Sequence, residues 1–166
     1  MPRPSSTLRL GDRCPDFQLR DAITGATRDL GTLLQDRRAL LLVFHRGMWC
    51  PNCRGQLGEL EEAWPACERQ GIAVAVVLAQ RCRKIAEAVA RRRTGYSFPI
   101  LCDRERDVIK RYGVWHPIGL SSFNTAHPAC FLIEAGSRCV RYSFVGSTQF
   151  ARAPMAAILD AAGDRA

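Results

Sequence analysis

Two continuous apolar runs constrain the fold of this chain more than any other feature. They are "RALLLVFH" at residues 38–45 and "IAVAVVLA" at residues 72–79. Each run has the length of a strand and no alternation with polar residues, which is typical of a strand buried on both faces. The segment between them carries Leu57, Leu60 and Trp64 at helical spacing. A buried strand, a helix and a second buried strand predict the centre of an α/β sheet.

The remaining segments extend this pattern on both sides. We expect an entry hairpin at 14–30, a helical turn at 31–36, a helix at 83–93, a strand at 96–101, a helix at 104–113, a hairpin at 128–146 and a closing helix at 153–163. Residues 114–127 are rich in turn formers and are predicted to be the only long loop. This order predicts an α/β fold with a central mixed sheet and helices on both faces, in one domain spanning residues 1–166.

Composition and charge narrow the class of protein. The chain has 166 residues, 47% of them hydrophobic and 24% charged, which fits one globular domain with its own core. No stretch has the 18 or so apolar residues of a membrane span, and "MPRPSSTLRLGDRC" at the start has no secretory pattern. We therefore expect a cytoplasmic protein with no membrane partner. The net charge of +8 comes from basic residues spread along the chain and set beside acids, so no nucleic-acid partner is predicted.

Eight cysteines are a high number for this length: 14, 50, 53, 67, 82, 102, 130 and 139. A disulfide framework is not expected, because a chain of this size can build a core and shows no export signal. Most of the thiols are interpreted as small apolar fillers, including Cys102 and Cys130 beside or within strand-like runs. Cys82, at the start of a predicted helix, is interpreted as a spare thiol able to form a disulfide with a partner.

The pair Cys50 and Cys53, in "FHRGMWCPNCRG", has the strongest chemical signal. Cys50 follows a buried strand and begins a helix, where unpaired N–H groups and the helix dipole favour a thiolate. Arg46 and Arg54 flank it, and cations also lower a cysteine pKa. Cys53 lies one turn on, on the same side of the helix, so the pair can cycle between dithiol and disulfide. Trp49 is expected to shield one side of the site.

Two other interpretations of this pair are weaker. A chance Cys-x-x-Cys is conceivable in a cysteine-rich chain, but the strand–pair–helix context is that of a thioredoxin-like redox site. A structural zinc ion needs two further ligands, usually a second such pair or two histidines. The three histidines are scattered and the other cysteines are single. We therefore predict a redox pair with no metal and no cofactor.

Four segments resemble the alkyl hydroperoxide reductase/thiol-specific antioxidant family, in its peroxiredoxin-like branch. "LGDRCPDFQL" is similar to the family's opening motif, and "LLLVFHRGMWCPNCRGQLGEL" to its cysteine signature. "FPILCDRERDVIKRYGV" and "HPACFLIEAGSRCVRYSFVG" resemble two later motifs, so the resemblance runs in order from about residue 10 to residue 146. It implies a thioredoxin fold with a peroxiredoxin-type N-terminal extension.

The resemblance also implies roles for individual residues. Pro128 occupies the place of the cis-proline that faces the cysteine pair in thioredoxin folds; alternatively it begins an edge strand. Cys50 stands where peroxiredoxins carry threonine, and Cys53 stands at their peroxide-attacking position, while the usual arginine position holds Pro128. Arg46 can supply a substitute cation. His45 stands where this branch often has tyrosine, as a pocket acid or base or, as we favour, as a packed core histidine.

Three functions follow as hypotheses. The first is a dithiol oxidoreductase that reduces peroxides or disulfides, with Cys50 attacking and Cys53 resolving, or with the two roles exchanged as in peroxiredoxins; Cys50 is the favoured nucleophile. It requires an external thiol reductant of thioredoxin or glutathione type. The second is a biosynthetic enzyme acting on a small molecule. The third is a non-enzymatic redox sensor. Relatives in this family often form dimers, so a homodimer is also conceivable.

Overall fold

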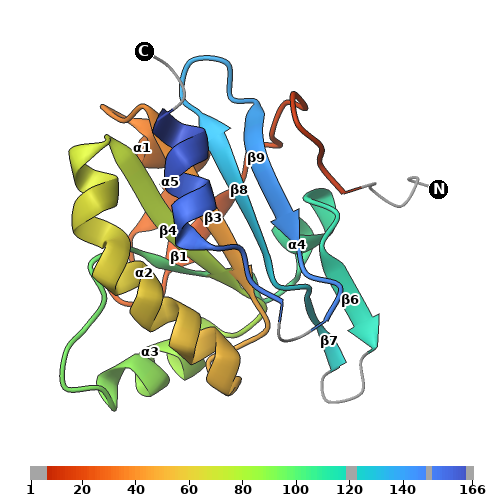
Figure 1. Ribbon diagram of the computed structural model, residues 1–166. Coiled ribbons are helices and arrows are strands. Elements are labelled where there is room, and N and C mark those ends of the chain that lie inside the picture. The colour runs from red at the N-terminus through yellow and green to blue at the C-terminus, as the bar shows by residue number, and fades with distance from the viewer. Residues whose placement is uncertain (1–6, 119–122, 149–150, 164–166) are drawn as a thin grey trace.

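A seven-stranded mixed sheet forms the centre of the computed structural model, which describes residues 7–118, 123–148 and 151–163 (Figure 1). Its strands are β1 (Gln18–Asp21), β2 (Thr27–Asp29), β3 (Ala39–His45), β4 (Ile72–Leu78), β5 (Ile100–Cys102), β8 (Ala129–Glu134) and β9 (Val140–Val145). They lie in the order β2-β1-β5-β4-β3-β8-β9. The neighbours β3, β4 and β5 are parallel, and the other pairs are antiparallel. The predicted mixed sheet is confirmed.

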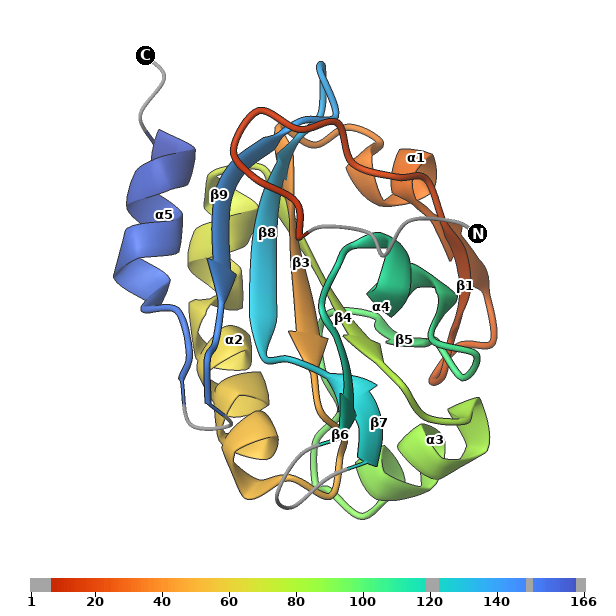
Figure 2. The same cartoon turned by 90° about the vertical axis from the view of Figure 1, so that its right-hand side faces the viewer.

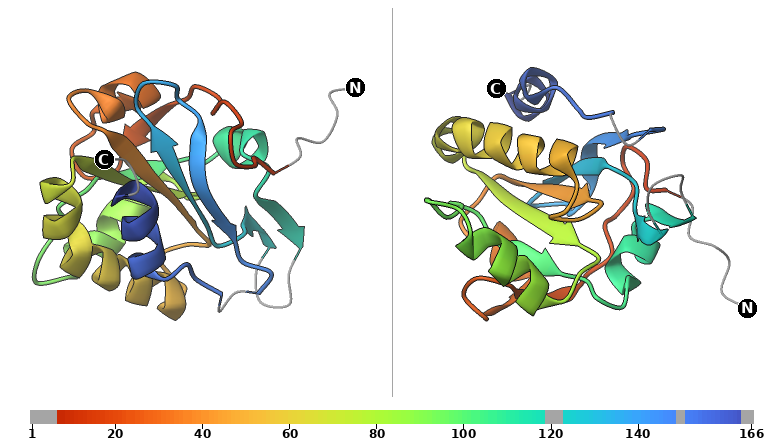
Figure 3. Two further views of the ribbon diagram at one scale, coloured as in Figure 1. Left: turned by 45° about the horizontal axis from the view of Figure 1, so that its top comes forward. Right: turned by 90° about the horizontal axis from the view of Figure 1, so that it is seen from below.

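Helices cover both faces of this sheet. They are α1 (Leu30–Leu34), α2 (Pro51–Arg69), α3 (Cys82–Ala90), α4 (Asp107–Arg111) and α5 (Met155–Gly163). Helices α2, α3 and α5 pack on one face, and α1 and α4 pack on the other. The right-hand view of Figure 3 shows α2, α3 and α5 on one side of the sheet and α4 on the opposite side. Within the described ranges, no helix is both long enough and apolar enough to cross a membrane.

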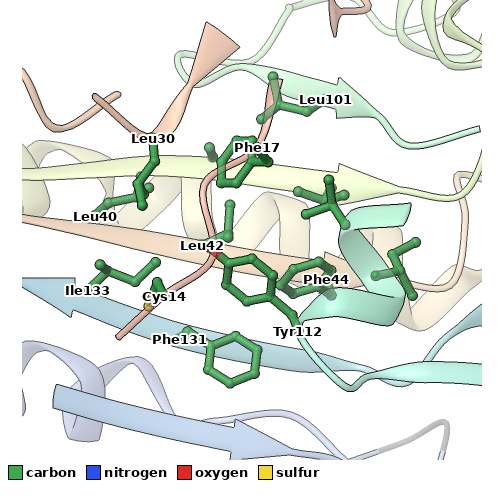
Figure 4. Packing of buried hydrophobic residues seen from close by; sticks show 14 of the residues in the cluster. Cys14, Phe17, Leu30, Leu40, Leu42, Phe44, Leu101, Tyr112, Phe131 and Ile133 are labelled. Carbon is green, nitrogen blue, oxygen red and sulfur yellow. The ribbon is translucent and has the colours of Figure 1, made fainter. Parts of the chain in front are cut away.

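Strand β3 explains the first apolar run of the sequence. All seven of its residues are buried, because alternate side chains enter two different cores. Leu41 and Val43 face the core beneath α2, α3 and α5. Phe44, on the opposite face, packs against Tyr112 with ring centroids 5.4 Å apart and against Phe131 at 5.8 Å (Figure 4). A central strand with helices on both sides therefore needs apolar residues at every position.

One sheet edge gathers the ends of the parallel strands. Because β3, β4 and β5 run in the same direction, their C-terminal ends lie together, and α2 and α3 begin there. Figures 1 and 2 both show the start of α2 and the whole of α3 at the lower end of the molecule. In open α/β sheets this edge is where ligands usually bind.

The predicted long loop at 114–127 is wrong over its described part. Strands β6 (Trp115–Ile118) and β7 (Phe123–Ala126) form a two-stranded antiparallel sheet, with Trp115 opposite Ala126. Residues 119–122, which include several of the turn formers, lie outside the described residues. A short ribbon with polar residues on both strands gives little periodic signal, so the turn formers led to the prediction of a loop.

Candidate active site

Cys50 lies at the point where a buried strand passes into a helix. Strand β3 ends at His45, a tight turn follows, and the Cys50 N–H donates to the Gly47 carbonyl at 3.2 Å. Cys50 is the N-cap of α2 with extended backbone angles, and Pro51 is the first helical residue. Proline suits that position because its missing N–H would have no partner within the helix. The sulfur of Cys50 therefore lies at the N-terminal end of a long helix.

The surroundings of Cys50 favour its thiolate. The residue is 1% exposed, and burial alone would raise its pKa. Hydrogen bonds from the Cys53 thiol and from the backbone N–H groups of Cys53 and Asn52 outweigh burial, with help from the charge of Arg46, so the pKa of Cys50 is lowered. A thiolate is the nucleophilic form of cysteine.

Cys53 has the opposite tendency. It is also 1% exposed, and burial together with the neighbouring Cys50 raises its pKa, although backbone N–H groups of Gly47 and Arg46 work against this. Arg152, on the segment before α5, places Nη2 3.4 Å from Cys53 Sγ. The raised pKa favours the protonated thiol at Cys53, and the Arg152 guanidinium lies where a charge-assisted hydrogen bond would stabilise a thiolate there.

Arg46 and Trp49 form one wall beside Cys50. Arg46 Nη1 lies 4.0 Å from Cys50 Sγ, and Arg46 Cζ lies 5.0 Å from the Trp49 ring centroid. The guanidinium is buried, whereas Trp49 is 45% exposed. A Cβ on Gly47 would collide with the Trp49 ring, so a larger residue at this turn would displace the ring from its present position. The substitute cation suggested by the sequence is therefore directed at Cys50.

His45 is buried behind the pair and bonded to Gln56. Its Nε2 lies 2.6 Å from Gln56 Oε1, and because an amide oxygen only accepts, Nε2 carries the hydrogen. Burial lowers the pKa of His45 to about 4; the Gln56 bond opposes this shift and the charge of Arg152 adds to it. The ring is fully buried and neutral at pH 7. These contacts are those of a packed core histidine.

The cis conformation expected at Pro128 is wrong. Every peptide bond in the described part of the chain is trans, the favoured form even before proline. The edge-strand alternative is also wrong, because Pro128 precedes β8, which lies between β3 and β9. The Pro128 carbonyl accepts the Gly146 N–H at 2.7 Å, which joins the start of β8 to the end of β9.

Two of the other cysteines were misinterpreted from sequence. Cys82 and Cys102 form a disulfide, with Cα atoms 5.3 Å apart, so Cys82 is not a spare thiol and Cys102 is not a filler. The reason is topological: β5 lies beside β4, so its end meets the start of α3. By contrast Cys14, Cys67 and Cys130 are free and buried, as fillers should be. Burial raises the pKa of Cys14 and of Cys130 to about 12.

Sequence reasoning missed Gln56, Gln80 and Arg152. Gln56 had a signal, because it follows Cys53 by three residues on the face of α2 that also buries Leu57 and Leu60. A polar residue on a buried helical face needs a partner. Gln80 and Arg152 had no local signal. Gln80 lies 32 residues from Met48, whose backbone N–H it accepts, and Arg152 lies 99 residues from Cys53, whose sulfur it contacts.

Taken together, the fold and site define a class of protein. A mixed sheet whose central strand leads into a helix that begins with Cys-Pro-Asn-Cys is the arrangement of thioredoxin-fold proteins with a cysteine pair. The sequence profile of the AhpC/TSA family matches residues 10–142. The chain belongs to this family, and the resemblance found in the sequence is confirmed.

Two curated sequences are similar to this chain over about two thirds of its length. Over 109 residues, this chain is 28% identical to the thiol-disulfide oxidoreductase ResA of Geobacillus thermodenitrificans. Over 111 residues, it is 30% identical to the thiol-disulfide oxidoreductase ResA of Geobacillus kaustophilus. Each match covers 66% of this chain and only 60% of the ResA sequence.

Solved structures match along nearly the whole chain. Peroxidoxin BcpB from Mycobacterium tuberculosis superposes with a TM-score of 0.82 at 22% identity, over 96% of this chain and 99% of that one. A peroxiredoxin-like protein from Aquifex aeolicus gives 0.82 at 16% identity, over 97% and 90%. The predicted thioredoxin fold of peroxiredoxin type is thereby confirmed.

Proposed function

We propose that this protein is a thiol-dependent oxidoreductase in which Cys50 attacks the substrate and Cys53 resolves the product. The opposite pKa shifts of the two cysteines carry the proposal, because a lowered pKa favours the nucleophilic thiolate at Cys50 and a raised pKa favours the thiol at Cys53. Membership of the AhpC/TSA family and the similarity to ResA proteins, which are named as thiol-disulfide oxidoreductases, support it.

The favoured substrate is a small peroxide. Both cysteines are 1% exposed, so a disulfide within a folded protein has little access to either sulfur, whereas a small hydroperoxide needs little space. Peroxiredoxins polarise the peroxide with a threonine and an arginine, and both are missing from their usual positions. Arg46 beside Cys50 and Arg152 beside Cys53 supply two guanidinium groups instead.

The proposed cycle has three steps. The Cys50 thiolate attacks one peroxide oxygen, the O–O bond breaks, and the leaving oxygen departs as an alcohol or water after gaining a proton. The resulting Cys50 sulfenic acid is attacked by the Cys53 thiolate, which forms the Cys50–Cys53 disulfide and releases water. An external thiol reductant, of thioredoxin or glutathione type, then returns two electrons and two protons.

A trapping experiment tests which sulfur attacks. The Cys53→Ser variant, treated with an aromatic disulfide probe, should keep one stable mixed disulfide on Cys50, because no resolving thiol remains. The Cys50→Ser variant should form none at Cys53, and Cys139→Ser is the matched control for losing a thiol elsewhere. An adduct on Cys53 alone would reverse the assignment.

A rate comparison tests the substrate class. The reduced protein is mixed in a stopped-flow instrument with hydrogen peroxide, with an alkyl hydroperoxide and with a protein disulfide. We expect a peroxide to oxidise Cys50 much faster than it oxidises a free thiol, and faster than the protein disulfide does. A peroxide rate equal to that of a free thiol would remove the peroxidase assignment.

A further inference from the structure

The Cys82–Cys102 disulfide lies at the same edge of the sheet as the Cys50–Cys53 pair. Cys82 is the first residue of α3 and Cys102 is the last residue of β5. The bond closes a loop across 20 residues and fastens the start of α3 to the sheet. Figure 2 shows α3 at the end of the molecule where α2 begins. One edge therefore carries two cysteine couples, one reduced and one oxidised.

A short chain of contacts joins the two couples. Gln80 precedes Cys82 by two residues, and its Oε1 accepts the Met48 N–H at 2.8 Å. Met48 is 5% exposed and belongs to the turn that leads into Cys50. Its carbonyl accepts from Arg54 Nη1 at 3.0 Å, so both sides of the Met48 backbone are held. The segment anchored by the disulfide thus supports the turn that positions Cys50.

The two sulfurs of the disulfide differ in access. Cys82 is partly exposed, whereas Cys102 is 8% exposed. Arg83 and Lys84 follow Cys82 with largely exposed side chains, and Arg81 precedes it. An incoming thiolate therefore has a route to Cys82 and meets positive charge on the way.

We propose that Cys82 and Cys102 are a second redox couple, and that its oxidation state sets the reactivity of Cys50 through Gln80. A dithiol reductant attacks the Cys82 sulfur; the bond to Cys102 breaks, and Cys102 leaves as a thiolate that takes up a proton. The second thiol of the reductant then attacks the mixed disulfide, which frees Cys82 and leaves the reductant oxidised. Two electrons and two protons pass to the protein. The start of α3 is then released from β5, and Gln80 no longer holds Met48.

The first test asks whether the couple is redox-active. The Cys50→Ser, Cys53→Ser double variant isolates it, so the outcome does not depend on the proposed function. The protein is equilibrated in buffers of graded dithiothreitol or glutathione ratio, and free thiols are counted by mass tagging without denaturant. We expect Cys82 and Cys102 to become tagged at ratios under which the protein stays folded. A bond that stays intact until the protein unfolds is a structural staple and would overturn the proposal.

The second test asks whether the couple controls Cys50, and this part rests on the Cys50 thiolate. In the Cys53→Ser background, the rate of Cys50 alkylation is measured before and after reduction of Cys82–Cys102. We expect a fall of about two- to tenfold, the range set by losing one backbone hydrogen bond. Gln80→Ala in the same background should remove the difference between the two states while leaving Cys82–Cys102 reduction unchanged, and Cys139→Ser should leave it in place. Equal rates in both states would overturn the coupling.

Discussion

Cys50 and Cys130 are equally buried, at 1% exposed each, yet their thiols are tuned in opposite directions. Cys130 lies within β8, between β3 and β9, and burial raises its pKa to about 12, only partly opposed by a backbone hydrogen bond from Phe144. Cys50 stands at the end of a helix and receives hydrogen bonds from Cys53 and Asn52, which outweigh the same kind of burial. Burial destabilises the thiolate and raises the pKa. The hydrogen-bond donors around the sulfur decide whether the thiolate is nevertheless stabilised.

The comparison extends to the two members of the reactive pair. Cys53 is also 1% exposed, but its pKa is raised, first by burial and then by the hydrogen bond to Cys50 and the charge that develops there. The opposite pKa shifts favour a thiolate at Cys50 and a thiol at Cys53. The proposed nucleophile and resolving group require this difference.

The largest expected effect comes from removing the sulfur of Cys50. Cys50→Ser should lower the rate of peroxide reduction by at least about a thousandfold, as loss of a nucleophile does in other enzymes. Cys130→Ala should leave that rate within about twofold, because its thiol is un-ionised and packed in the core. Steady-state peroxide consumption with a thiol reductant measures both. Comparable losses in the two variants would break the distinction between them.

The next effect is an alkaline loss of stability specific to Cys130. The unfolded thiol ionises near pH 8.5, but the folded one only near 12, so the unfolded state releases its proton first and stability falls as the pH rises between these values. By pH 11 the loss reaches about 3 kcal/mol. The free energy of unfolding is measured in urea at pH 8 and at pH 11. Between these two pH values, the stability of Cys130→Ala relative to the wild-type protein should increase by that amount.

The matched variant Cys50→Ser should have the opposite sign. A lowered pKa in the folded state contributes stability above the unfolded pKa, and this is lost as the pH falls through the folded pKa. Removing the Cys50 thiol should therefore make the reduced protein relatively less stable at high pH. The same sign for both variants would contradict the account.

A smaller effect is expected from the cation beside Cys50. Arg46→Met keeps much of the side-chain volume but removes the charge 4.0 Å from the sulfur. The pKa of Cys50 should rise, which lowers the thiolate fraction and the alkylation rate at neutral pH by up to about tenfold. Arg54→Met, on the other flank, is the matched control. An unchanged pH profile in Arg46→Met would assign the shift to the hydrogen bonds from Cys53 and Asn52 alone.

The sequence predicted most of the sheet because its strands are buried on both faces. The runs that became β3 and β4 read as continuous apolar stretches, and the hairpin of β8 and β9 turns at Ala135 and Gly136 as expected. The ribbon of β6 and β7 was predicted to be a loop, because β6 is mostly exposed and both strands are too short to leave a periodic signature. The local hydrophobic pattern predicts a strand where the core requires apolar residues, and it predicts little elsewhere.

The candidate site divides in the same way. Cys50, Cys53 and Arg46 could be named from one short motif, because strand, turn and helix follow each other directly. Arg152 reaches Cys53 from 99 residues away, and Cys82 reaches Cys102 across 20 residues, so only the folded sheet brings them together. The expected cis-proline came from resemblance, and the trans bond before Pro128 corrects it.

The most direct test of the central claim is the pH dependence of alkylation at each cysteine. The reduced protein is pulsed with iodoacetamide from pH 4 to pH 10, and modification of every cysteine is quantified by mass spectrometry. The account predicts that Cys50 reacts with a midpoint below about 8.5, the value of a free thiol, while Cys53 and Cys130 react only above it. A Cys50 midpoint at or above that of a free thiol, or a midpoint for Cys53 below that of Cys50, would contradict it.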